Sequence, residues 1–180
     1  MVFNLANILT LGRIFLVPVI VLLLAYPGRM TCMTALIFFA AASLTDLADG
    51  FVARRYNQIT TLGKFLDPIA DKILVSSVLI SLVGLGWVPA WAAVIIVVRE
   101  ILVTGLRAVA AQQGLVIAAD AYGKIKTVFQ MLSIGPLILH YPVFGIDPNP
   151  LGLTMLYISL VMTVYSGGNY FLNFYKIWTK

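Results

Sequence analysis

The sequence predicts an all-α integral membrane protein, a six transmembrane helix bundle with a short N-terminal interfacial segment. Hydrophobic residues make up 61% of its 180 residues, charged residues make up 11%, and the mean hydropathy is +1.00. This composition is too apolar for a soluble domain of the same length. Apolar stretches close to the roughly 20 residues that a spanning helix needs recur along the whole chain. We therefore expect residues 1–180 to form a single transmembrane domain.

The apolar stretches, and the turn-forming residues between them, place the helices along the chain. The expected helices cover residues 5–26, 31–54, 61–85, 90–111, 121–139 and 151–175. The early part of the first helix carries Asn7, Thr10 and Arg13 at every third position, and this part is the expected interfacial segment. These polar residues either anchor the first helix or contact the functional site, and the sequence leaves both alternatives open.

Basic residues orient the bundle, because cytoplasmic loops of membrane proteins carry an excess of Lys and Arg. The other side of the predicted bundle has only Arg29. The side with the basic residues holds Arg13, Arg54, Arg55, Lys64, Arg107, Lys124, Lys126, Lys176 and Lys180. Both termini are therefore expected in the cytoplasm. The net charge of +5 follows from this topology, so no nucleic-acid partner is expected. A single cysteine, Cys32, excludes an internal disulfide and a thiolate metal site.

Four of the seven acidic residues fall between positions 43 and 72, inside an otherwise apolar sequence. They are Asp46, Asp49, Asp67 and Asp71. Left unpaired in lipid, four carboxylates would cost about 10 kcal/mol or more, so they must face water, cations or basic partners. The first two share one helical face and the last two share another, with a polar turn expected between the two helices. Folding back at this turn brings all four carboxylates into one cluster at the cytoplasmic helix ends.

Carboxylate oxygens without nearby His or Cys favour a hard cation, Mg²⁺ or Mn²⁺, over zinc or copper. Four aspartates suffice to bridge two such ions, and paired metal ions usually clamp phosphate oxygens during a displacement. Basic residues on neighbouring helices offer a place for a second anionic group beside this clamp. These are Arg107, Lys124 and Lys126. A metal site next to an anion site at a membrane surface indicates phosphoryl transfer on a lipid.

The acidic stretch resembles the signature of the CDP-alcohol phosphatidyltransferase family without gap or substitution. The matching pattern is Asp46-x2-Asp49-Gly50-x2-Ala53-Arg54-x8-Gly63-x3-Asp67-x3-Asp71. Within that family the chain is most similar to bacterial members that use sn-glycerol 3-phosphate. The similarity extends over residues 4–13, Arg99-Glu100-x6-Arg107 and Gly123-Lys124-Ile125-Lys126-Thr127 with Gln130. Ala6 stands where the family pattern has Pro.

The resemblance implies transfer of a phosphatidyl group from CDP-diacylglycerol to sn-glycerol 3-phosphate, with release of CMP. It implies a metal site of Asp46, Asp49, Asp67 and Asp71, in which Asp71 also serves as the catalytic base. It further implies that the CDP-lipid is bound by Gly50, Ala53, Arg54 and Gly63. A homodimer in the bacterial cytoplasmic (inner) membrane, with the active site facing the cytoplasm, is expected on the same basis. Arg107, Lys124 and Lys126 are then the expected binding site for the acceptor phosphate.

Other interpretations of the same residues remain open at this stage. The four aspartates would also suit an ion-pair network with Arg54, Lys64 and Lys72 that only joins helices. The basic residues would also suit anchors that reach toward lipid head groups. Inositol phosphate, phosphatidylglycerol and serine are alternative acceptors, and a divalent-cation transporter or a protein that binds CDP-lipid without turnover are alternative functions. Arg99 and Glu100 are expected to form an internal salt bridge.

Overall fold

The computed structural model describes the backbone of residues 5–55, 61–112 and 121–178. Side chains are described for residues 8–45, 66, 68–112, 123, 125–172, 174 and 175. Within these ranges the chain forms six helices, which confirms the predicted helical class. They are α1 (Leu5–Ala25), α2 (Arg29–Arg55), α3 (Thr61–Gly84), α4 (Ala90–Gln112), α5 (Ala121–Leu139) and α6 (Asn149–Trp178). α1 is continuous from Leu5 to Ala25, so an interfacial segment distinct from it stays a prediction.

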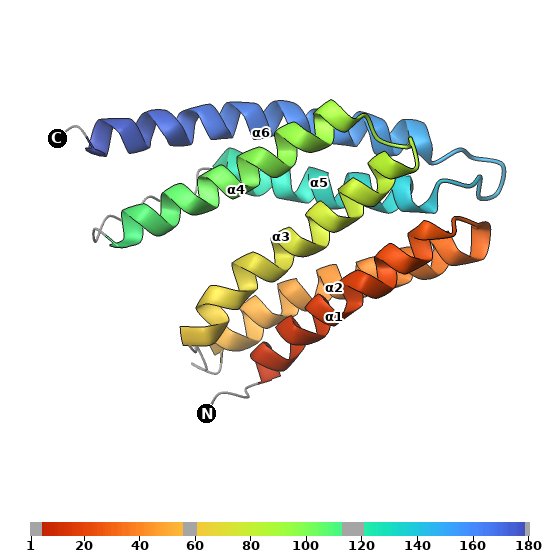
Figure 1. The fold of residues 1–180 in the computed structure, drawn as a ribbon, viewed down its shortest axis with the longest axis horizontal. Coiled ribbons are helices and arrows are strands. Elements are labelled where there is room, and N and C mark those ends of the chain that lie inside the picture. The colour runs from red at the N-terminus through yellow and green to blue at the C-terminus, as the bar shows by residue number, and fades with distance from the viewer. Residues whose placement is uncertain (1–4, 56–60, 113–120, 179–180) are drawn as a thin grey trace.

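The helices form two groups of three that diverge toward the end of the molecule where both termini lie (Figure 1). In one group α1 packs along α2 and α3, and in the other α6 packs along α5 and α4. Contacts of α2 with α5 and of α3 with α4 and α5 join the groups. The connections α1–α2, α3–α4 and α5–α6 all lie at the end opposite the termini (Figure 1).

Helical periodicity explains which residues form the core. On α1 the buried residues Val17, Ile20 and Leu24 recur at the spacing of one helical face. The same spacing on α3 buries Leu74, Val78 and Leu82. The other helices contribute to this core Cys32, Ala35, Phe39, Ala42, Ala92, Ala93, Ile96, Ile134, Leu137, Ile138, Leu156 and Leu160.

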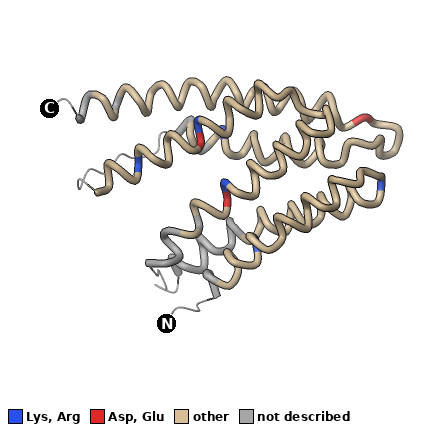
Figure 2. Tube along the Cα trace, in the orientation of Figure 1, with Lys and Arg blue, Asp and Glu red and all other residues tan. Residues whose placement is uncertain are grey.

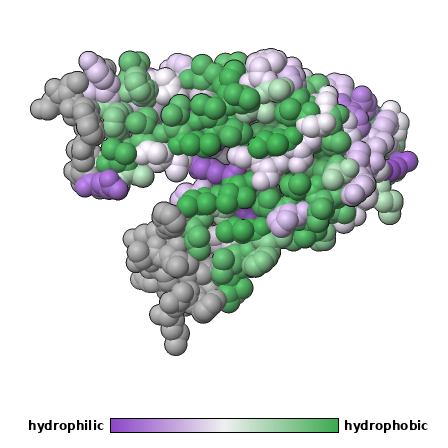
Figure 3. All heavy atoms as spheres, viewed as in Figure 1, coloured by the Kyte–Doolittle hydropathy of each residue, from purple (hydrophilic) through white to green (hydrophobic). Residues whose placement is uncertain are grey.

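The outward faces of the helices are apolar as well. Phe15 is 74% exposed on α1, Ile80 is 62% exposed on α3 and Val161 is 68% exposed on α6. The space-filling view accordingly has an outer surface that is largely hydrophobic, with hydrophilic side chains in the hollow between the two groups (Figure 3). A helix that is apolar all round is typical of a membrane span. Within the described residues, two helical segments are long and apolar enough to cross a bilayer, Ile8–Ala25 and Asn149–Leu172.

The end opposite the termini is closed by a glycine turn and stacked rings. Gly86 has a φ of 75°, and the amide of Trp87 donates to the carbonyl of Leu82 at 2.9 Å, a pattern that ends a helix and favours glycine. This turn brings the Trp87 indole onto the His140 ring, with centroids 3.6 Å apart and planes 3° apart. The α3–α4 and α5–α6 connections are thereby joined. Arg29 donates to the carbonyl of Pro142 in the α5–α6 connection, which also contains Asp147, and Figure 2 shows basic and acidic positions at this end.

Candidate active site

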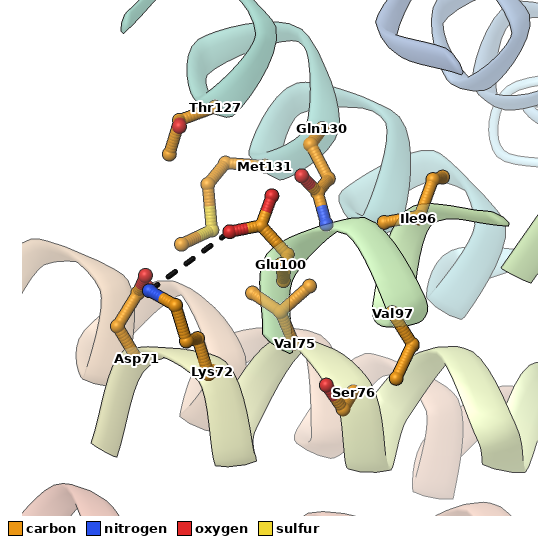
Figure 4. A pocket seen from close by; sticks show the side chains of 10 residues that line it. All are labelled: Asp71, Lys72, Val75, Ser76, Ile96, Val97, Glu100, Thr127, Gln130 and Met131. Atoms are coloured by element: carbon orange, nitrogen blue, oxygen red, sulfur yellow. Dashed lines mark ion pairs between the residues drawn. The ribbon is translucent and has the colours of Figure 1, made fainter. Parts of the chain in front are cut away.

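A polar pocket lies among α3, α4 and α5, inside the otherwise apolar bundle (Figure 4). Asp71 and Lys72 reach it from α3, and Glu100 reaches it from α4. The side of the pocket formed by α5 carries Thr127 and Gln130. The remaining lining residues are Val75, Ser76, Ile96, Val97 and Met131. Ionisable side chains enclosed among apolar helices are costly and often mark a functional site, so this pocket is the candidate active site.

Glu100 is the centre of the charges around the pocket. One carboxylate oxygen pairs with the Lys126 ammonium group, and the same oxygen lies 3.4 Å from Nη1 of Arg99. The other oxygen lies 3.9 Å from Nζ of Lys72. The Lys126 side chain is only 4% exposed, so its charge needs a partner within the protein. A single carboxylate therefore connects α3, α4 and α5, and the predicted Arg99–Glu100 salt bridge is confirmed.

Arg99 extends the charge cluster to α6. Its guanidinium donates a hydrogen bond to the buried hydroxyl of Ser166. Gly167 leaves room for this side chain, because a Cβ atom there would lie 3.1 Å from Cγ of Arg99. The small residue at 167 and the hydroxyl at 166 together hold the guanidinium against α6. The charge cluster thus contacts every helix of the second group and α3 of the first.

Positive charge exceeds negative charge among the described residues of this cluster. Lys72, Arg99 and Lys126 are cations, while Glu100 and Asp71 are the carboxylates nearby. Lys72 lines the pocket, while Arg99 and Lys126 lie beside it as partners of Glu100. Cationic donors this close favour an anionic ligand, because hydrogen bonds between charged groups are the strong ones. Asp71 on the same pocket provides a carboxylate able to accept a proton from such a ligand.

Among the aspartates predicted from the sequence, the described side chain is that of Asp71, and it lines the pocket. The side chains of Asp46, Asp49 and Asp67 lie outside the described residues. Their backbone belongs to the C-terminal half of α2 and the first third of α3, and the ends of these two helices lie near each other at the end with both termini (Figure 1). The predicted carboxylate cluster therefore stays a prediction that the helix arrangement permits.

The predicted anion-binding residues have different surroundings. Lys126 is buried in the charge cluster beside the pocket, whereas Arg107 is exposed, and neither is a lining residue of the pocket. Its guanidinium carbon lies 5.3 Å from the ring centre of Tyr170, at a distance typical of a cation–π contact. The residues of the predicted site whose side chains lie outside the described part are Gly50, Ala53, Arg54, Gly63 and Lys124.

Thr127 and Gln130 line the pocket, although in the sequence they belong only to the family resemblance and neither is among the predicted site residues. Gln130 lies one helical turn after Lys126 and is only 3% exposed, in a helix that is apolar beyond it. A lysine and a glutamine four residues apart in such a helix share a face, and this is the signal that would have identified it.

The predicted metal-ligating side chains can be compared with the ligands that divalent cations prefer. Within the part of the chain that the structure describes, no group of three or more His, Cys, Asp or Glu side chains gathers to hold a metal. The predicted ligands are all carboxylates, which suit Mg²⁺ or Mn²⁺. A hydrated cation also needs polar surroundings, and Asp71 lies at a pocket with polar lining residues. The residues present therefore fit such an ion in their chemistry.

The fold and the pocket together define a class of helical protein with an apolar exterior and a charged internal pocket. A family model described as CDP-alcohol phosphatidyltransferase matches residues 3–165. The chain belongs to this family of enzymes, as the acidic signature predicted.

Curated relatives agree with this membership. The chain is 42% identical to the CDP-diacylglycerol–glycerol-3-phosphate 3-phosphatidyltransferase of Bacillus subtilis, over 94% of both proteins. It is 38% identical to a protein of the same name from Rickettsia typhi, over 93% of this chain and 95% of that protein. The protein of that name from Shigella flexneri is 35% identical, over 92% of both.

Proposed function

We propose that this chain transfers the phosphatidyl group of CDP-diacylglycerol to sn-glycerol 3-phosphate, giving phosphatidylglycerophosphate and CMP. The observation that carries this proposal is the pocket itself, where Asp71 and the cation Lys72 are lining residues and Lys126 lies beside the pocket, paired with Glu100. The acceptor needs both features, since its phosphate is an anion and its hydroxyl must lose a proton. The names of the relatives support the choice of this acceptor over serine, inositol phosphate or phosphatidylglycerol.

In the proposed reaction, the primary hydroxyl oxygen of glycerol 3-phosphate attacks the β-phosphorus of CDP-diacylglycerol. The new P–O bond forms as the bond from this phosphorus to the oxygen of CMP breaks, and CMP leaves with that oxygen. Asp71 accepts the proton of the attacking hydroxyl. Lys126, together with Arg107 and Lys124, binds the acceptor phosphate through charge-assisted hydrogen bonds. Glu100 holds Lys126 at the pocket while the acceptor is absent.

The donor is assigned to the other predicted residues. Gly50, Ala53 and Gly63 leave room for the cytidine diphosphate, and Arg54 contacts its phosphate. Two ions of Mg²⁺ or Mn²⁺ would be held by Asp46, Asp49, Asp67 and Asp71. When bound, these ions would neutralise the negative charge of the diphosphate. Val75, Ile96 and Val97 form an apolar part of the pocket wall.

The same proposal includes the membrane topology. Residues 1–180 form one transmembrane domain of six spans with both termini in the cytoplasm, in a homodimer of the bacterial inner membrane. Three observations support the membrane spans and the placement of both termini on one side: two long apolar spans, apolar outward faces, and termini at one end of the bundle (Figure 1). Arg29 and Asp147, at the opposite end, would then face the periplasm (Figure 2).

The proposal is tested by CMP release from CDP-diacylglycerol, using detergent-purified protein with Mg²⁺ and sn-glycerol 3-phosphate. We expect CMP from the unmodified protein, and none after chelation of divalent cations. Asp71→Asn should lower the rate by about 10²-fold or more, the loss typical of a missing general base. Asp147→Asn, at the other end of the molecule, is the matched control and should retain the rate. Normal turnover by Asp71→Asn would exclude the assigned base.

A further inference from the structure

Arg13 is a buried charge in the first helix, far along the sequence from the pocket residues. Its side chain is fully enclosed, with only 2% of the residue exposed, and Thr10 one turn earlier is completely buried. An arginine that only anchored α1 at the membrane surface would extend its charged end toward water. Arg13 instead points into the bundle, where a guanidinium is retained only when the protein supplies acceptors.

The acceptor for Nε of Arg13 is the backbone carbonyl of Ala42 on α2, at 3.2 Å. The hydroxyl of Thr45 donates to the same carbonyl at 2.7 Å. In an α-helix the carbonyl of residue 42 also accepts the amide of residue 46. Arg13 therefore binds the carbonyl at the start of the helical turn that ends at Asp46, and α2 continues as a helix to Arg55.

We propose that Arg13 is a positioning residue for the metal-binding end of α2. Its hydrogen bond to Ala42 fixes the turn that leads into Asp46, and so sets where the aspartates of α2 lie relative to those of α3. Arg13 does not touch substrate in this role; it acts through the α2 backbone. The inference rests on the proposed function, because it takes Asp46 and Asp49 as ligands of a divalent cation.

Side-chain length makes a sharp test possible. The amide nitrogen of glutamine stands the same number of bonds from Cα as Nε of arginine, and the terminal methyl of methionine occupies the same position without a donor. Arg13→Gln therefore retains the hydrogen bond and loses the charge, while Arg13→Met loses both. Arg29→Met is the matched control, because Arg29 also donates to a backbone carbonyl, that of Pro142 at 3.4 Å, but at the opposite end of the bundle.

Two readouts are measured on detergent-purified protein. The first is the rise in unfolding temperature on adding Mg²⁺ without substrate, and the second is the Mg²⁺ concentration that gives half-maximal CMP release. Arg13→Met should require about tenfold more Mg²⁺, the change expected from one lost hydrogen bond to a charged group, and should lose most of the Mg²⁺-induced rise. Arg29→Met should match the unmodified protein within about threefold, and Arg13→Gln, which keeps a weaker, uncharged donor, should fall between the unmodified protein and Arg13→Met. Arg13→Asn, polar but too short to reach, replaces Arg13→Met if the latter does not fold.

The inference is overturned if Arg13→Met responds to Mg²⁺ as the unmodified protein does, even with a lower unfolding temperature, because its role is then only structural. It is also overturned if Arg13→Gln behaves like Arg13→Met, since the charge rather than the bond to Ala42 would matter. Failure of the proposed function has a different signature. In that case the unmodified protein itself releases no CMP and does not respond to Mg²⁺.

Discussion

The carboxylate of Glu100 pairs with the ammonium group of Lys126, joining α4 to α5 inside the bundle. The same carboxylate lies 3.9 Å from Nζ of Lys72 on α3. The neutral analogue Glu100→Gln would leave a nearly buried lysine without the carboxylate that it pairs with. Breaking a buried pair in this way costs about 3 kcal/mol or more, so we expect a clear fall in the unfolding temperature in detergent.

Ser166→Ala is the matched control for this prediction. It removes the hydrogen bond that Arg99 donates to α6 but leaves the Glu100 carboxylate in place. The loss in the free energy of unfolding should therefore be much smaller, about 1 kcal/mol. Equal unfolding temperatures for Glu100→Gln and the unmodified protein would contradict the view that Glu100 holds the cluster together.

Lys126→Ala tests the assignment of the acceptor phosphate. Because hydrogen bonds to charged groups are worth about 1.5 to 3 kcal/mol, the KM for sn-glycerol 3-phosphate should rise roughly ten- to hundredfold. The KM for CDP-diacylglycerol should change little, since the donor is assigned to the α2–α3 end. Steady-state kinetics with each substrate varied in turn separates the two. An unchanged acceptor KM, or an equal rise in both KM values, would remove Lys126 from the acceptor site.

Gly152 tests the close packing of α5 against α6. A Cβ atom at this position would lie 2.7 Å from Cγ of Leu137 and 3.2 Å from its backbone nitrogen, and Leu137 is fully buried. Because the backbone of Leu137 would have to shift to admit the new methyl group, Gly152→Ala should destabilise the protein by about 1 to 3 kcal/mol. Gly168→Ala on the same helix meets no atom within 4 Å and should be neutral or slightly stabilising. The unfolding temperatures of the two variants are measured in parallel. A lower unfolding temperature for Gly168→Ala than for Gly152→Ala would contradict the described packing of α5 against α6.

The positions of the helices could be predicted from the sequence because each apolar stretch is bounded by turn-forming residues. Their ends were less predictable. α6 begins at Asn149 rather than at residue 151, because Pro150 falls in the first turn, where a missing amide proton removes no helical hydrogen bond. α2 begins at Arg29 rather than at residue 31, and the amide of Cys32 already donates to the carbonyl of Gly28 at 2.9 Å. Prolines and glycines at these positions were expected to lie in loops.

The candidate site was predictable where residues lie close in the sequence and unpredictable where helices meet. The Arg99–Glu100 pair follows from adjacent residues, and it was foreseen. The pairing of Glu100 with Lys126 depends on how α4 packs against α5, which spacing within one helix does not determine. The burial of Arg13 likewise depends on the packing of α1 against α2 and α3. Helical periodicity gives the face of a residue but not the helix that this face meets.

The most direct test of the central claim is a comparison of acceptors in one CMP-release assay, with CDP-diacylglycerol and Mg²⁺ held constant. The acceptors are sn-glycerol 3-phosphate, serine, inositol, inositol phosphate and phosphatidylglycerol. We expect CMP release with sn-glycerol 3-phosphate alone, accompanied by phosphatidylglycerophosphate as the lipid product. Release with a different acceptor, or with none of them, would contradict the assignment of this pocket to glycerol phosphate.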